Sequence, residues 1–203
     1  KGNGTWASAG LAIEQTSAGD GNTAGGSTAL DSLTAVSGLR NTAFGADAGT
    51  ALTAGDDNVL IGYQAGDALT TGSGRNTAIG TSALGAMTTG TDNTAVGFQT
   101  LLVSTGTSNV GVGGYALTAN SSGTYNTAIG FQALTSIQTN SFSTAVGAYA
   151  LILNTAAANT AVGYSSLYAN TSGVRNTGLG YQSLSAIVTT NDSTAVGYNA
   201  LLL

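Results

Sequence analysis

The chain of 203 residues contains no cysteine, no proline and no histidine, and only 6% of its residues are charged. Without cysteine there are no disulfides and no thiolate ligands for a metal. Without histidine the commonest general base is missing. The charged fraction is far below the roughly 25% of typical soluble domains. This composition argues against an enzyme, and we expect no cofactor.

Positive charge and long apolar runs are also scarce. The four cations, Lys1, Arg40, Arg75 and Arg175, are too few and too scattered to neutralise a run of phosphates, and the net charge is −5. No apolar run approaches the ~20 residues that a transmembrane helix needs. The sequence therefore predicts neither nucleic-acid binding nor insertion of this segment into a membrane.

What the chain has in abundance is one pentapeptide. NTAIG and its variants, among them NTAFG, NTAVG and STAVG, occur eleven times at intervals of 16 to 19 residues. The copies begin at Asn22, Asn41, Asn58, Asn76, Asn93, Asn109, Asn126, Ser143, Asn159, Asn176 and Ser193. Helical-pair repeats need about 33 residues or more, so the shorter period indicates one turn of a parallel β-solenoid.

Each period predicts two short strands joined at the motif glycine. The first is Thr-Ala-Val and the second is x-x-Ala-Leu, as in Phe131-Gln132-Ala133-Leu134. Glycine at the corner permits a positive φ, and asparagine at position one predicts a stacked amide ladder. The repeat columns comprise Asn41, Gly45, Asn58, Gly62, Asn76, Gly80, Asn93, Gly97, Asn126, Gly130, Asn159, Gly163, Asn176 and Gly180. Eleven stacked coils would form a rod segment on the order of 50 Å long.

Strand alternation predicts a second apolar face. Neighbouring strand residues point to opposite sides, so Ala and Val in the first strand, and Ala and Leu in the second, face opposite ways. One face lines the coil, and the other needs a partner. We therefore expect a homo-oligomer, most simply a parallel trimer. Which residues face inward is left open by the sequence.

The repeat divides the chain into two parts. Residues 1–21 match the period poorly and are interpreted as an N-terminal adaptor or leader segment. Residues 22–203 form the repetitive shaft, and they end in Ala200-Leu201-Leu202-Leu203 without the polar cap that closes solenoids. This pattern predicts a fragment of a longer fibre.

NTAIG and NTAVG, together with following units such as Phe-Gln-Ala-Leu at 131–134, Tyr-Gln-Ala at 63–65 and Tyr-Gln-Ser-Leu at 181–184, resemble two groups of proteins, over roughly residues 22–203. One is the head region of trimeric autotransporter adhesins, and the other is the repetitive shaft of bacteriophage tail fibres and spikes. The resemblance implies a trimeric left-handed parallel β-roll and a role in surface attachment. The longer period and the unit that follows the motif glycine, such as Phe-Gln-Ala-Leu at 131–134, favour the phage-like group.

Carboxylates offer one candidate for chemistry. Asp47, Asp56, Asp57 and Asp67 form a local acidic cluster, the weak candidates for a Ca²⁺ site or a glycosidase pair. The alternative interpretation, solvated turn residues that keep a rod soluble, is favoured.

Arginine precedes the motif asparagine in three coils, at Arg40, Arg75 and Arg175, and Tyr125 takes the same place in a fourth. This corner is interpreted either as an anion- or carbohydrate-binding edge or as side chains that cover the turn or reach a neighbouring chain. The structural interpretation is favoured.

An aromatic column follows the motif glycine by one or two residues: Tyr63, Phe98, Tyr115, Phe131, Tyr149, Tyr164, Tyr181 and Tyr198. A packing ladder is the favoured interpretation, and sugar binding on the ring faces is the alternative. Threonine at motif position two forms another column. A regular threonine array could bind ice, although only a single rank is present.

Together these patterns predict the structural shaft of an extracellular, cell-surface or virion-tail fibre that attaches to a host or surface. Its expected partners are copies of itself and a cell-surface carbohydrate or host receptor. A self-assembling extracellular filament that stacks head to tail is the alternative, and ice-binding and carbohydrate-binding solenoids are lesser ones.

Overall fold

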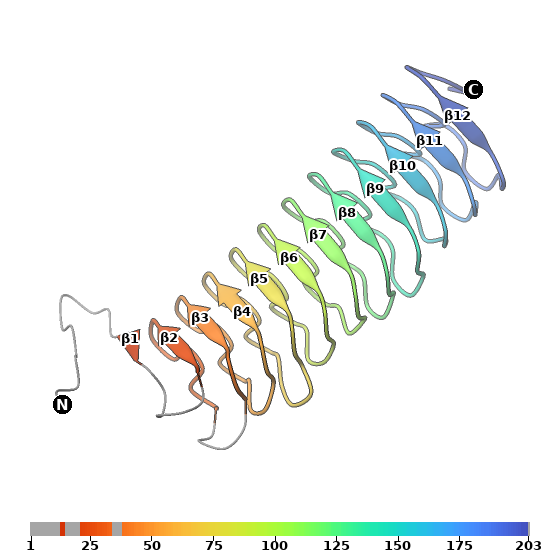
Figure 1. Ribbon diagram of the computed structural model, residues 1–203. Helices are drawn as coiled ribbons and strands as arrows, with labels where there is room; N and C mark the ends of the chain where they lie inside the picture. The colour runs from red at the N-terminus through yellow and green to blue at the C-terminus, as the bar shows by residue number, and fades with distance from the viewer. Residues whose placement is uncertain (1–12, 15–20, 34–37, 203) are drawn as a thin grey trace.

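A computed structural model describes residues 13–14, 21–33 and 38–202, and these contain strands and turns but no helix. Each coil contributes one short strand, and the strands lie one behind another along a straight rod (Figure 1). The strands are β1 (Ile13–Glu14), β2 (Thr23–Gly25), β3 (Thr42–Phe44), β4 (Val59–Ile61), β5 (Thr77–Ile79), β6 (Thr94–Val96), β7 (Val110–Val112), β8 (Thr127–Ile129), β9 (Thr144–Val146), β10 (Thr160–Val162), β11 (Thr177–Leu179) and β12 (Thr194–Val196).

All strands belong to one sheet in sequence order, and β2 to β12 pair in parallel. The register follows the motif, so that Thr144 pairs with Thr160 and Ala145 with Ala161. The predicted parallel β-solenoid, with coils about 17 residues apart, is confirmed. The repeated motif specifies this register because each position of the pentapeptide meets its own counterpart one coil away.

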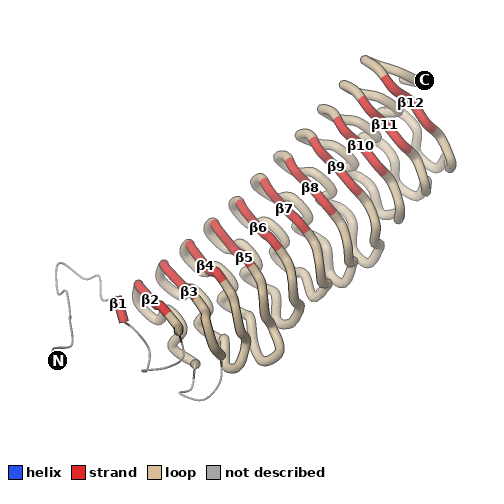
Figure 2. The backbone as a smooth tube through the Cα atoms, in the orientation of Figure 1, coloured by secondary structure: helices blue, strands red, loops and turns tan. Residues whose placement is uncertain are grey.

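The second predicted strand is wrong. The stretch after the motif glycine is a turn in each coil, and Figure 2 shows strand on one side of the rod only. In the Asn126 coil, Gln132 has φ 54° and Leu134 has φ 51°, both left-handed. This kink turns Ala133 and Leu134 to the same side, and both are fully buried. The expected alternation of Ala and Leu therefore does not occur there.

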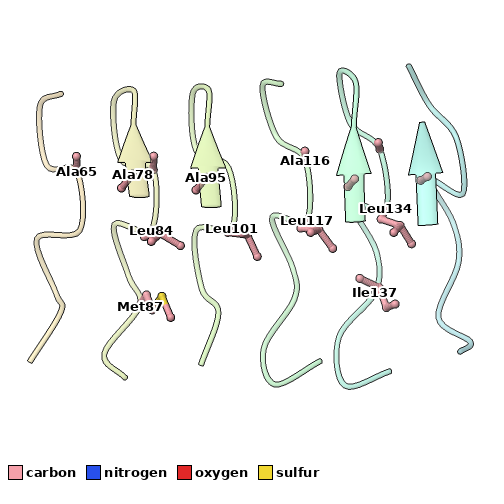
Figure 3. Close-up of a cluster of buried hydrophobic side chains, with 14 of the residues drawn as sticks. Ala65, Ala78, Leu84, Met87, Ala95, Leu101, Ala116, Leu117, Leu134 and Ile137 are labelled. Atoms are coloured by element: carbon pink, nitrogen blue, oxygen red, sulfur yellow. The ribbon is translucent and has the colours of Figure 1, made fainter. Parts of the chain in front are cut away.

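The core is a thin column of small and aliphatic side chains inside the coil. It holds the strand alanines together with the turn alanines and leucines, and Figure 3 shows Leu84, Leu101, Leu117 and Leu134 following one another along it. This settles the facing that the sequence left open. Alanine of the strand points inward, and the aliphatic residue at motif position four points outward.

One coil compensates for missing core leucines. Gly49 and Gly66 stand where other coils have a turn leucine. A Cβ on Gly66 would lie 2.8 Å from Leu60 Cδ2, and one on Gly49 would lie 2.7 Å from Leu60 Cδ1. Leu60 replaces the usual strand alanine and is fully buried. Its side chain, with Leu30 on the side of Gly49 and Leu69 on the side of Gly66, thus fills the space that both glycines leave.

The asparagine column forms the predicted ladder. The side-chain oxygen of Asn58 accepts a hydrogen bond from the backbone N–H of Asn76 at 3.1 Å, and the same bond recurs between the other stacked motifs. At Ser143, which stands in the place of an asparagine, the hydroxyl oxygen accepts the hydrogen bond from the backbone N–H of Asn159 at 3.4 Å. Each asparagine is buried, so these hydrogen bonds compensate for the hydrogen bonds to water that the side chain loses on folding.

The motif glycines are required by close backbone approach. Gly130 has φ 138°, and a Cβ there would lie 2.5 Å from the carbonyl carbon of Gly147 in the next coil. The other motif glycines have φ between 116° and 138°. From Gly26 to Gly180 no side chain fits this column, because the next coil stacks at β-sheet spacing, about 4.8 Å.

The N-terminal end of the sheet differs from the rest. β1 pairs antiparallel with β2, with Ile13 opposite Gly25. It occupies the edge of β2 to which a further parallel strand would add. The remainder of the adaptor segment predicted over residues 1–21 lies outside the described residues, apart from Gly21.

Candidate interaction surfaces

The outward face of the sheet carries threonine and aliphatic side chains in two parallel ranks. Ile79 is 38% exposed and Leu179 is 45% exposed, whereas the alanine between the two ranks is buried. None of the hydroxyls in the threonine rank forms a hydrogen bond within the described part of the chain; the rank comprises Thr23, Thr42, Thr77, Thr94, Thr127, Thr144, Thr160, Thr177 and Thr194. The face is therefore apolar with a line of unengaged hydroxyls.

The aromatic column runs beside this face, separated from it by the motif glycines. Seven rings, from Phe98 to Tyr198, contact one another with centroids 5.2 to 5.9 Å apart. Where the ring alternates between the first and second residue after the glycine, neighbours meet edge to face. Where it stays at the first residue, as in Tyr164, Tyr181 and Tyr198, the rings stack at 14°.

The predicted packing ladder is thus present for seven of the eight aromatics. Tyr63 is 51% exposed and makes no ring contact among the described residues, because Ala46 and Thr81 take the neighbouring places in the column. Stacking covers the faces of Tyr181 on both sides, so the continuous part of the column presents ring edges and hydroxyls outward. That geometry does not suit a sugar platform along the whole column.

The sheet face and the part of the aromatic column next to it form one stripe without charge, here called the apolar stripe. It consists of motif positions two and four and the first residue after the motif glycine. No Asp, Glu, Lys or Arg occupies any of these three columns. Phe131 is 44% exposed and Ile129 41% exposed. A contiguous exposed apolar surface of this kind marks an interaction site.

The corner before the motif asparagine holds ion pairs rather than an open edge. Arg40 donates from Nε and Nη2 to Asp57 at 2.6 and 2.8 Å. Arg75 with Asp92, and Arg175 with Asp192, repeat this bidentate pair. These hydrogen bonds hold the pKa of each aspartate below its ordinary value and raise the pKa of each arginine.

The partners of these arginines were missed in the sequence, although the signal was available. When the residue before each motif is read coil by coil, it runs Arg40, Asp57, Arg75, Asp92, and later Tyr125, Phe142. The two rings stack at 5.6 Å with an interplanar angle of 4°. Complementary side chains therefore sit one coil apart, which favours the structural interpretation of this corner.

The four acidic candidates do not act as one cluster. Asp57 is engaged by Arg40, Asp56 accepts a hydrogen bond from the Leu39 backbone at 2.7 Å, and Asp47 accepts one from the Thr28 hydroxyl. Burial raises the pKa of the Asp67 carboxyl, and backbone hydrogen bonds oppose that rise. Among the described residues, no three acidic, histidine or cysteine side chains are grouped to hold a metal.

The chain was compared with protein-family models, with curated proteins and with solved structures. None of them matches. The resemblance to fibre shafts therefore rests on the repeat motif. The described residues contain no helix that is long and apolar enough to span a bilayer.

Proposed function

We propose that this chain is a structural shaft, a stiff segment of an extracellular or virion-surface fibre that presents an attachment function. The observation that carries the proposal is the unbroken coil-to-coil bonding over eleven strands. Backbone pairing, the asparagine ladder and the aromatic column all run along the same axis. A rod of this kind resists bending because every coil is bonded to the next by several parallel columns.

The apolar stripe supports self-association as part of this function. It extends along the rod without a charged residue, and its aliphatic residues are about two-fifths exposed, as at Ile61 and Ile129. Burying such a surface against parallel copies is favourable by about 25 cal/mol per Å². A parallel trimer would cover the stripe on each chain and keep the Arg–Asp corner in water.

The head-to-tail filament finds less support. A copy stacked before the first coil would need the edge of β2, and β1 already pairs there in the antiparallel sense. Such a copy would have to displace β1 before parallel pairing could continue.

The test is the mass of the chain in solution, measured by multi-angle light scattering at increasing urea concentration. A mass three times 19.7 kDa that persists until cooperative unfolding is expected. A monomer at every protein concentration would contradict self-association through the stripe. Replacing Ile79 and Ile129 with Lys should dissociate the trimer, while the same change at the half-buried corner residue Ser108, where other coils carry Arg, serves as the control.

The unengaged threonine hydroxyls favour ice binding as a second candidate function. They form a line at β-strand spacing beside an aliphatic rank. Thermal hysteresis of the folded chain tests this function. If a folded, monomeric sample shows no thermal hysteresis, ice binding is ruled out. The two functions compete for the sheet face, so a trimer that covers it would also remove ice binding.

A further inference from the structure

A small hollow lies on the surface of the rod between the Asn159 and Asn176 coils. It has a volume of about 300 Å³ and is open to solvent. Its walls are Tyr164, Ser165, Tyr168, Gln182 and Ser185. It lies at the aromatic column but includes residues outside the apolar stripe.

The hollow exists because one coil has a small residue where its neighbours have large ones. Ser165 is the second residue after its motif glycine, and the same place holds Tyr149 one coil before and Gln182 one coil after. All three have left-handed φ, between 50° and 60°, so the backbone is the same in each. The missing side-chain volume, not a change of backbone, opens the space.

The polar groups of the hollow are unengaged. Ser165 is only 6% exposed, yet its hydroxyl has no hydrogen-bond partner among the described residues. The same holds for the Gln182 amide, the Ser185 hydroxyl and the two tyrosine hydroxyls. The Ser165 hydroxyl is reached by solvent through the hollow, and so are the other groups, so these donors and acceptors are available to an incoming ligand.

Of the two tyrosines that line the hollow, Tyr168 is the one whose ring does not pack against another aromatic ring in the described part of the chain. Tyr164 meets Tyr149 edge to face and stacks on Tyr181, so its ring is already packed. Tyr168 is 40% exposed and has no aromatic contact among the described residues. Its ring is therefore partly exposed at the hollow and is not part of the aromatic column.

The absence of charged residues around the hollow favours a neutral ligand. None of the five lining residues is charged, and no charged residue occurs between Asp92 and Arg175 in the sequence. A sugar ring offers an apolar C–H face for an aromatic wall and several hydroxyls for amide and hydroxyl partners. We propose that this hollow binds one residue of a neutral carbohydrate, with Tyr168 as its apolar wall and Ser165, Gln182 and Ser185 as its hydrogen-bonding partners.

This inference rests on the attachment part of the proposed function, for which it names a ligand class. The test is saturation-transfer NMR on the full chain with D-glucose, D-galactose and N-acetyl-D-glucosamine, and with D-glucuronate as the charged comparison. At least one neutral sugar should bind with a Kd of about 1–10 mM, as expected for a ligand of this size. D-glucuronate should bind at least about tenfold more weakly, because the hollow offers its carboxylate no cation.

Ser165→Gln fills the hollow and should weaken binding by about tenfold or more. The variant is expected to fold, because Gln99 takes φ 50° at the same repeat position. Ser82→Gln is the matched control: Ser82 holds the equivalent place in a coil with Thr81 and Gly85 instead of the two tyrosines. Binding should be unchanged in that variant. Tyr168→Thr should also weaken binding, and Tyr168→Phe should retain most of it.

Two results would overturn the proposal: no saturation transfer to any of the three neutral sugars, or equal binding by the parent and Ser165→Gln. Light scattering on the same samples separates the two proposals. A trimer without sugar binding contradicts the hollow alone, whereas a monomer whose sugar binding depends on Ser165 contradicts the shaft and leaves the hollow in place.

Discussion

The coils up to Asp92 and those from Asn93 to Val174 follow one backbone path but differ inside and out. The first region contains Asp31, Arg40, Asp47, Asp56, Asp57, Asp67, Arg75 and Asp92, and the second contains no charged residue. The other charged residues lie before the first coil or, as Arg175 and Asp192, after the second region. Inside, the seventh residue after the motif glycine is Leu52, Leu69 or Met87 in the three coils from Asn41 to Asp92. In the second it is Ser104, Asn120, Ile137, Asn154 or Asn170. All of these are fully buried.

The amides are tolerated inside the second region because their Nδ2 groups bond to one another and to the backbone, although Oδ1 of Asn120 and of Asn170 has no partner among the described residues. Asn154 Oδ1 accepts hydrogen bonds from Nδ2 of Asn159 at 3.1 Å and of Asn170 at 2.9 Å. Asn120 Nδ2 donates to Ser104 Oγ at 3.2 Å. The comparison shows that the motif columns define the coil, while the space beyond them accepts either apolar or amide side chains.

The largest effect is expected where the two regions are alike. Gly62→Ala and Gly130→Ala should each destabilise the fold by about 3 kcal/mol or more, because φ is near 137° and the new Cβ would overlap the next coil. Urea unfolding measures both. Gly72→Ala is the control: φ is 82° but no atom lies within 4 Å of the new Cβ, so only about 1–2 kcal/mol of backbone strain is expected. Tolerance of alanine in one region alone would break the comparison.

The apolar interior of the first region is tested at Leu60. Leu60→Ala should cost about 2–5 kcal/mol by leaving a cavity beside Gly49 and Gly66. Adding Gly66→Leu restores the arrangement of the other coils, alanine in the strand and leucine in the turn, and should recover part of the loss. Thermal unfolding of both variants checks this. If the double variant is less stable than Leu60→Ala, the leucine in the strand does not stabilise this coil by filling the space of the missing turn leucine.

The amide interior of the second region is tested at Asn154. Asn154→Ala should destabilise by about 1–3 kcal/mol, because the Nδ2 groups of Asn159 and Asn170 lose a buried acceptor. Asn154→Leu restores volume, as at Leu52, but not the acceptor, so it should remain less stable than the parent. If Asn154→Leu and the parent have the same free energy of unfolding in urea, the buried amides contribute only volume and the two interiors are equivalent.

The smallest expected effect is the change in stability when the pH is lowered. The pKa of Asp57 and Asp92 is lowered by their arginines, so these pairs stabilise the fold above the ordinary aspartate pKa of 3.8, and this is lost as pH falls through the lowered value. Asp67 has the opposite sign, because its raised pKa makes protonation favourable in the fold. Amide exchange at pH 6 and pH 3, corrected for intrinsic rates, should therefore change slightly in the first region and not between Asn93 and Val174. A larger change in the second region would contradict this assignment.

Much of the architecture was available from the sequence. An eleven-fold motif with a period near 17 predicted parallel in-register stacking, and Asn58 and Asn76 showed why asparagine recurs. The aromatic column was predicted as a packing ladder, and seven rings confirm it. These features follow from periodicity alone, because identical residues one coil apart must meet.

The second half of each coil depended on the tertiary structure. Leu134, Gln132 and Tyr125 all have φ near 55°, a conformation that costs roughly 1–2 kcal/mol in an isolated non-glycine residue. Local sequence therefore pointed to a strand there. The stacked coil offsets the strain, since the Leu134 N–H donates to the Ala150 carbonyl of the next coil at 3.1 Å and the side chain enters the core. The motif determined which residues stack, whereas the bonding between coils decided how the chain turns.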